Sequence, residues 1–185
     1  MSKKYTKVAA DTFEKIQLNA GILLSSFDPE APEVVDTNII GATSGGNSFT
    51  ATPNYIDYGD DIDNVPANTK ELKELDYWEA KMSGSFVSAG TKTAKLLCGA
   101  ADVSTGKVTP RNYLKTDDFS DIWWVGDYTN GNDGLIAIRL INALSSGGFS
   151  LQSTDNGKGT YAYEFIGHYS LETLDTVPFE IYISE

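Results

Sequence analysis

The nine residues from Trp78 to Phe86 read WEAKMSGSF and alternate between apolar and polar side chains. The apolar positions are Trp78, Ala80, Met82, Gly84 and Phe86, and the polar positions are Glu79, Lys81, Ser83 and Ser85. Successive side chains of an extended strand point to opposite sides, so a period of two is typical of a strand with one buried face. This stretch therefore predicts a long, half-buried β-strand and a mainly β fold.

The same alternation returns toward the C-terminus, over residues 160–169 and 179–183. Two apolar runs, 122–125 and 135–138, flank the segment Tyr128–Gly134, which contains Asn-Gly and Asp-Gly steps. Those dipeptides tolerate the positive φ angles that tight reversals require. The pattern predicts an antiparallel hairpin here and further strands near the end of the chain.

One segment, residues 91–101, has a helical period instead. Its apolar positions fall at i, i+3, i+4 and i+7 and are Ala94, Leu97, Cys98 and Ala101. Thr91 is a suitable N-cap. Gly99 inside a helix costs about 1 kcal/mol relative to Ala, so packing against a sheet must hold the helix. We expect one short helix flanking the strands.

Residues 28–68 are rich in turn formers, with four prolines, a Gly45-Gly46-Asn47 reversal and an acidic run around Asp60. A long loop inside one domain is usually functional or mobile. We therefore expect a loop-rich arm that contacts a partner. Its apolar and aromatic candidates for that contact are Ile39, Ile40, Phe49, Tyr55, Tyr58 and Ile62.

Length, charge and composition limit the classes of protein. The 185 residues predict a single domain over 1–185, since an ordinary domain has about 150 residues. The net charge is -12, and half of it lies between Pro53 and Ala80, where eight acidic residues face two lysines. Tight nucleic-acid binding needs a basic face, so a grip on DNA is excluded while proximity to DNA is not. We expect no secretion signal and no membrane span.

The residues that carry chemistry form no set. One Cys and one His exclude an internal disulfide and a Cys/His zinc site. The acidic run 57–64 lacks the spacing of a calcium-binding EF-hand loop, and no activated nucleophile accompanies His168 and Glu164. Cys98 belongs to the apolar helix face. We therefore expect a protein that is not an enzyme, with no catalytic, cofactor or metal residues.

Several stretches, taken in order, resemble the major tail tube protein of long non-contractile-tailed bacteriophages. They are residues 15–24, 27–29, 39–46, 49–53, 60–66, 70–73, Trp78, 97–103 and 177–182. The signal lies in their order along most of the chain. At the level of fold the chain is also similar to the tube-forming protein of type VI secretion.

The resemblance implies a tail-tube-type β-sandwich or small barrel of antiparallel strands. Rings of six subunits would stack into a hollow conduit for DNA ejection. Its partners would be copies of itself, a tail initiator, a tape-measure protein and a terminator, with DNA passing unbound. The protein would be made in the bacterial host cytoplasm and located in the virion tail.

An acidic tube wall would let DNA slide without sticking. We expect Glu79 and Glu164 to face the lumen and Lys81 to be paired with a nearby carboxylate. Two other classes of protein stay open from the sequence. The aromatic residues could line a glycan-binding face, with one of Trp123 and Trp124 in the core, and paired carboxylates could serve a hydrolase.

Overall fold

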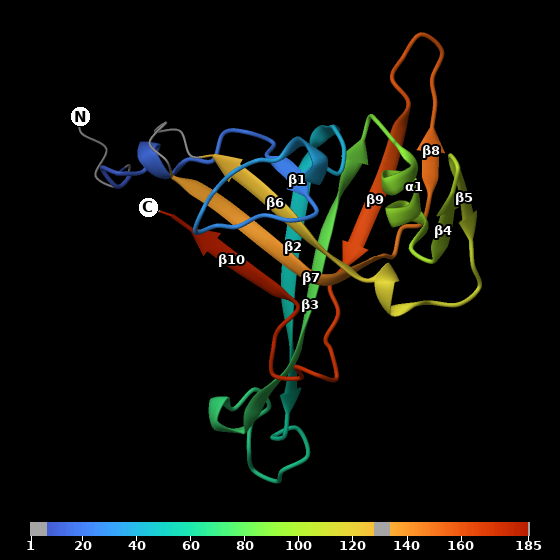
Figure 1. Cartoon of the computed structure of the whole chain (residues 1–185). Helices are drawn as coiled ribbons and strands as arrows, with labels where there is room; N and C mark the ends of the chain where they lie inside the picture. The colour runs from blue at the N-terminus through green and yellow to red at the C-terminus, as the bar shows by residue number, and fades with distance from the viewer. Residues whose placement is uncertain (1–6, 128–133, 185) are drawn as a thin grey trace.

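The strand predicted from the alternation is β3, which runs from Lys73 to Phe86 in the computed structural model (Figure 1). The structure describes residues 7–127 and 134–184. Ala80, Met82 and Phe86 are buried on one face of β3, as the alternation requires. β3 pairs with β2 along one edge. Along the other edge it pairs with β9, over Lys81–Phe86 only.

An eight-stranded antiparallel sheet forms most of the molecule, in the order β1-β6-β7-β9-β3-β2, with β10 added to β7 and β8 to β9. Its other strands are β1 (Ile22–Leu24), β2 (Thr43–Asp57), β6 (Ser120–Asp127), β7 (Leu135–Ser145), β8 (Ser150–Gln152), β9 (Thr160–Ile166) and β10 (Phe179–Ile183). A separate hairpin pairs β4 (Ala101–Ser104) with β5 (Lys107–Pro110). The β6–β7 pairing confirms the predicted hairpin, although most of its turn, 128–133, lies outside the described residues.

The sheet has two halves: β1, β6 and β10 lie in one, and β2, β3, β8 and β9 lie in the other. The long strand β7 belongs to both halves. Its first part pairs with β6 and β10, whereas Leu144 and Ser145 pair with β9. The change falls near Asn142, which has a φ of 49° and donates its backbone N–H to Asp121 Oδ1 at 3.0 Å. Asn is one of the few residues that adopt this left-handed conformation readily.

The two halves pack their apolar faces against each other. The main core is Leu23, Ala80, Met82, Phe86, Leu97, Ile122, Ile138, Leu140, Ala143, Tyr163 and Phe165. A second cluster, on the opposite face of β6 and β7, is Leu24, Phe27, Trp123, Val125, Leu135 and Ala137. Over the described residues the strand path runs from β1 to β2 without closing, so the expectation of a barrel is wrong.

The predicted helix exists but is shorter than expected. Helix α1 spans Thr91–Cys98, and Gly90 rather than Thr91 is its N-cap. Gly99 lies just beyond the end of the helix with a φ of 69°, where it donates its N–H to Leu96 O. Glycine at this position ends a helix without steric strain, so it does not lie inside the helix. Thr93 fastens α1 to the segment between η2 and β2 by donating its hydroxyl to Ile40 O at 2.8 Å.

Four short 3-10 helices complete the described structure. They are η1 (Phe13–Lys15), η2 (Asp36–Asn38), η3 (Lys70–Leu72) and η4 (Thr116–Asp118). η3 lies directly before β3 and η4 shortly before β6.

The expectation of a loop-rich arm over 28–68 is wrong in its middle third, because β2 is a strand of 15 residues. Gly45 and Gly46 have φ angles of 84° and 85°, and they lie within the register shift between Thr43 and Asn47. They therefore make an irregularity inside a strand, not a reversal. Pro53 is compatible with β2 because β2 is an edge strand, which needs N–H groups on one side only.

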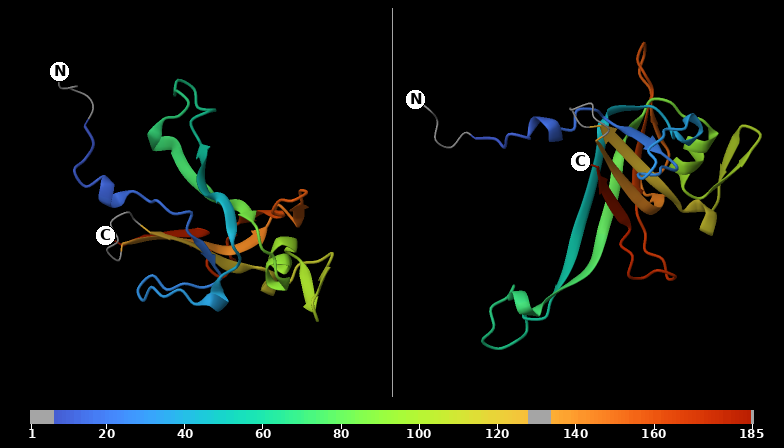
Figure 2. Two further views of the ribbon diagram at one scale, coloured as in Figure 1. Left: turned by 90° about the horizontal axis from the view of Figure 1, so that it is seen from above. Right: turned by 60° about the vertical axis from the view of Figure 1, so that its left-hand side comes forward.

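The outer halves of β2 and β3 leave the body of the molecule as a projecting hairpin (Figure 2). Beyond the Ala51–Ala80 pair, the strands pair only with each other, down to Asp57 and Lys73. We call residues 52–57 and 73–79 the ribbon, and the connecting residues 58–72 the tip.

Candidate interaction surfaces

The ribbon and the tip expose large apolar side chains within the described part of the chain. The exposed apolar residues of the ribbon and tip are Tyr55, Ile56, Tyr58, Ile62, Leu75 and Tyr77. An isolated two-stranded hairpin is marginally stable in water. Two hydrogen bonds tie the base of the ribbon to the body of the molecule. Trp78 N–H donates to Tyr169 Oη at 2.8 Å, and Gly167 N–H donates to Ala80 O at 3.0 Å. The exposed apolar area points to a partner.

Asp57 organises the tip. Its carboxylate accepts the backbone N–H of Gly59 at 3.0 Å and that of Asn68 at 2.6 Å, which closes the loop between them. These backbone hydrogen bonds lower the pKa of Asp57, and the one from Asn68 has the larger effect. Lys73 Nζ adds a hydrogen bond to Asn68 Oδ1 at 2.8 Å. The tip is thus a loop held by hydrogen bonds that presents most of its side chains to solvent.

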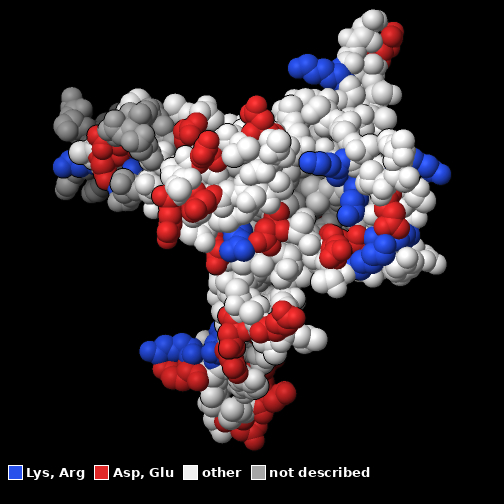
Figure 3. Space-filling model, in the orientation of Figure 1, with Lys and Arg blue, Asp and Glu red and all other residues white. Residues whose placement is uncertain are grey.

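The acidic side chains of the tip stay in solvent. Asp60, Asp61 and Asp63 are exposed and make no ion pair within the described part of the chain. Figure 3 shows acidic side chains over the end of the projecting hairpin. No three Asp, Glu, His or Cys side chains converge on a metal-sized site among residues 7–127 and 134–184.

The outward face of β2, β3 and β9 is mostly polar. Cross-strand pairs place Ser48 beside Ser83, Thr50 beside Lys81 and Thr52 beside Glu79. The same register places Glu164 opposite Ser83, so Glu79, Lys81 and Glu164 share this face.

Lys81 is paired, as expected. Its Nζ lies 2.5 Å from Glu79 Oε1, and the hydrogen bond to Glu79 raises the pKa of Lys81. Glu164 Oε1 accepts the hydroxyl of Ser146 at 2.6 Å. The face therefore carries one neutralised lysine and one further carboxylate.

The six apolar arm candidates lie in three different environments. Tyr55, Tyr58 and Ile62 lie on the ribbon and tip and are exposed. Ile40 and Phe49 pack against the main core of their own chain. Ile39 is 40% exposed and forms an isolated bridge with Leu24.

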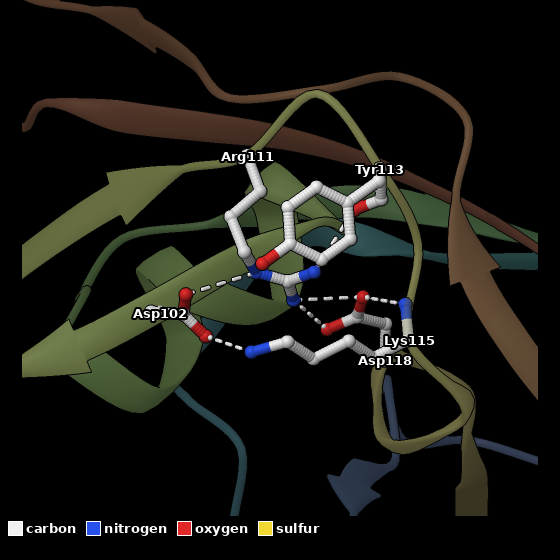
Figure 4. A network of polar contacts seen from close by, with 5 residues as sticks. All are labelled: Asp102, Arg111, Tyr113, Lys115 and Asp118. Atoms are coloured by element: carbon white, nitrogen blue, oxygen red, sulfur yellow. Dashed lines mark hydrogen bonds and ion pairs between the residues drawn. The ribbon is translucent and has the colours of Figure 1, made fainter.

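A network of charged side chains holds the β4–β5 hairpin to η4 (Figure 4). The Arg111 guanidinium donates to both oxygens of Asp118, at 2.6 and 2.8 Å, and its Nε lies 3.1 Å from Asp102. Lys115 Nζ reaches Asp102 at 2.9 Å, and the Tyr113 ring lies 5.1 Å from the guanidinium. The hydrogen bonds from Arg111 and Lys115 lower the pKa of Asp118 and Asp102, respectively.

Sequence reasoning missed this network, and composition offered a signal for it. The chain has two arginines among its 14 basic residues. Both join carboxylates from two different elements: Arg111 as above, and Arg139 to Asp121 at 2.6 Å and Glu180 at 3.0 Å. Arginine's planar fork suits paired carboxylates, so a rare arginine in a lysine-rich chain marks a structural ion pair.

His168 and Cys98, whose side chains could take part in catalysis in other proteins, make packing contacts here. His168 lies just past the end of β9, with Nδ1 3.0 Å from Asn142 O and its ring 5.3 Å from that of Phe119. Burial raises the pKa of Cys98, which disfavours its reactive thiolate.

The two adjacent tryptophans point to opposite sides of β6. Trp123 is buried in the second cluster, where its ring lies 5.5 Å from that of Tyr182. Trp124 is half-buried against the main core and donates its indole N–H to Ala20 O at 2.9 Å. Trp78, the third tryptophan, lies 5.4 Å from Phe179. All three indoles are thus partly or fully covered.

The described structure is that of a mainly β protein in which the β2–β3 hairpin projects from the sheet. No protein-family model matches the chain, and no curated protein matches it either. Within the described ranges, no helix has the length and apolarity needed to cross a membrane.

Proposed function

We propose that this chain is a structural protein that assembles with copies of itself into a tube, of the type formed by the major tail tube proteins of long-tailed bacteriophages. The observation that carries the proposal is the ribbon with its tip, whose large apolar side chains are 37–55% exposed within the described part of the subunit. A monomeric soluble protein rarely keeps large apolar patches exposed. In the assembled tail, neighbouring subunits cover them.

The open sheet supports the same proposal. β2 and β10 each pair with one strand only among the described strands, whereas residues 38–40 cover the outer edge of β1. A free edge accepts a strand from another chain through backbone hydrogen bonds. Edges and a ribbon that differ from one another favour heterologous contacts, which generate closed rings or extended tubes. We propose six-membered rings of a tail-tube-type sandwich, stacked on an initiator and closed by a terminator.

The polar face of β2, β3 and β9 is the surface we propose for the lumen. It presents serine and threonine hydroxyls, Glu79 and Glu164, and a lysine already neutralised by Glu79. Free lysines along a tube would bind successive DNA phosphates, release their counterions and so retain the DNA. This face offers few free lysines. DNA would therefore slide through without specific binding.

Electron microscopy and sedimentation velocity of the purified full-length chain test this function. Rings or tubes that sediment faster than a 20.1 kDa monomer are expected. A chain that stays monomeric at high micromolar concentration overturns the proposal. If that monomer also binds oligosaccharides, the chain is a glycan-binding module instead.

A further inference from the structure

Two ends of this molecule carry opposite charge although the whole chain is acidic. Residues 53–80, which include the ribbon and the tip, have eight acidic and two basic side chains. Residues 91–118, which contain α1, β4, β5 and η4, have five basic and three acidic side chains. Their net charges are therefore -6 and +2. We call the surface of residues 91–118 the α1–β5 face.

The positive charge of the α1–β5 face is available for a partner. Asp102 and Asp118 are already engaged by Arg111 and Lys115. The remaining lysines of this face, Lys92, Lys95 and Lys107, make no ion pair within the described residues. Figure 3 shows basic side chains gathered on this side of the molecule.

The tip is the complementary surface. Asp60, Asp61 and Asp63 are exposed and make no ion pair among the described residues. Each surface also exposes apolar side chains beside its charges. These are Tyr58 and Ile62 on the tip, and Val103, Tyr113 and Leu114 on the α1–β5 face. A contact between them would pair charges at its rim and bury apolar area at its centre.

The tip cannot reach the α1–β5 face of its own subunit. The ribbon projects away from α1, β4 and β5 in every view (Figures 1 and 2). Charges of opposite sign on two distant surfaces of one chain instead suit a contact between copies, in which each subunit offers its tip and receives another.

We propose that the acidic tip of one subunit docks on the α1–β5 face of a neighbouring copy. The proposal rests on the self-assembly proposed above and names the surfaces that meet. It assigns the tip a partner other than the N-terminal lysines Lys3 and Lys4, which also carry positive charge.

Charge reversal and re-pairing test this contact in the full-length chain. Asp60→Lys with Asp61→Lys places positive charge on the tip, and Lys92→Glu with Lys107→Glu places negative charge on the partner face. All four side chains are exposed, so the fold should tolerate the changes. We expect each double variant to raise the concentration needed for assembly at least tenfold. The quadruple variant, with both surfaces reversed, should return most of the way to wild type.

A matched control separates the contact from net charge. Asp155→Lys with Asp175→Lys changes the total charge as much as the tip variant but lies on exposed loops elsewhere. We expect it to assemble at nearly the wild-type concentration. Circular dichroism and thermal melting establish that every variant is folded.

Each remaining outcome decides against the docking. Wild-type assembly by the tip variant overturns it, and so does a folded quadruple variant that fails to recover. Recovery of the tip variant by Lys3→Glu with Lys4→Glu assigns the tip to the N-terminal lysines instead. A wild-type chain that never assembles overturns both this docking and the proposed function, whereas a wild-type chain that assembles with variants unaffected overturns the docking alone.

Discussion

The two ends of β3 form opposite environments within one strand. At its C-terminal end, residues 81–86 lie between β2 and β9, and Met82 and Phe86 are buried. At its N-terminal end, residues 73–77 pair with β2 alone and leave Leu75 and Tyr77 exposed. The inner end stabilises the subunit itself, because its apolar side chains are buried. The outer end contributes little to that stability, which is why we look for its purpose in assembly.

The largest expected effect on stability lies at the inner end, in the core that β3 shares with β9. Phe165 is fully buried, and its ring stacks on Tyr163 at 5.3 Å. Phe165→Ala should lower the free energy of unfolding by about 3–5 kcal/mol, because it removes buried area and leaves a cavity. Urea denaturation followed by tryptophan fluorescence measures this. A loss below about 1 kcal/mol would mean that the two halves of the sheet do not share a core.

The Arg111–Asp118 pair should give the next largest effect, and one that depends on pH. Both side chains are almost fully covered, so Asp118→Asn leaves the Arg111 charge without its main partner. The pKa of Asp118 is lowered in the folded protein, so its contribution to stability is present above its unfolded pKa and is lost as pH falls through the folded pKa. Melting temperatures of wild type and variant should differ at pH 7 and converge in acid. A constant difference across that range would contradict the assignment.

Within the inner end of β3, Gly84 leaves room for a tyrosine. A Cβ on Gly84 would lie 2.5 Å from Tyr163 Oη and 2.8 Å from its Cζ, in the packed core. Tyr163 also donates its hydroxyl to Asn47 Oδ1, so the ring is held. Gly84→Ala should cost about 1–3 kcal/mol by overpacking. Gly90→Ala is the matched control, since its Cβ would meet open space and should cost much less.

The smallest effect on stability is expected on the ribbon, and it should coincide with a large effect on assembly. Tyr77→Ser removes an exposed ring, so the free energy of unfolding should change by less than about 0.5 kcal/mol. Sedimentation velocity should nevertheless show fewer rings or tubes. Normal assembly by Tyr77→Ser and by Tyr55→Ser would sever the link between the ribbon and subunit contacts.

The sequence predicted strands where the apolar face is visible and failed where it is not. β3 and β10 alternate plainly, so both were found. The inward face of β2 carries Asn47, Phe49, Ala51 and Pro53, a set too mixed in polarity to indicate a strand. Its neighbour β3 supplies the apolar face that β2 lacks, and that pairing cannot be predicted from local sequence.

The candidate surfaces show the same limit. Glu79, Lys81 and Glu164 come together because of the register between β3 and β9, although the pairing of Lys81 was expected from the sequence. The acidic tip was visible as a run of charges, but its separation from the α1–β5 face required the three-dimensional arrangement. The two ends of helix α1 were misjudged because Gly90 and Gly99 lie at its caps.

The sharing of β7 between both halves of the sheet has a mechanical consequence. Force applied to the half that carries the ribbon passes into the half that carries β10 through one continuous backbone, bent at Asn142. Neither half can slide along the other without breaking the hydrogen bonds of β7. We expect a subunit built this way to resist sliding between its halves, which would suit the tube wall proposed above.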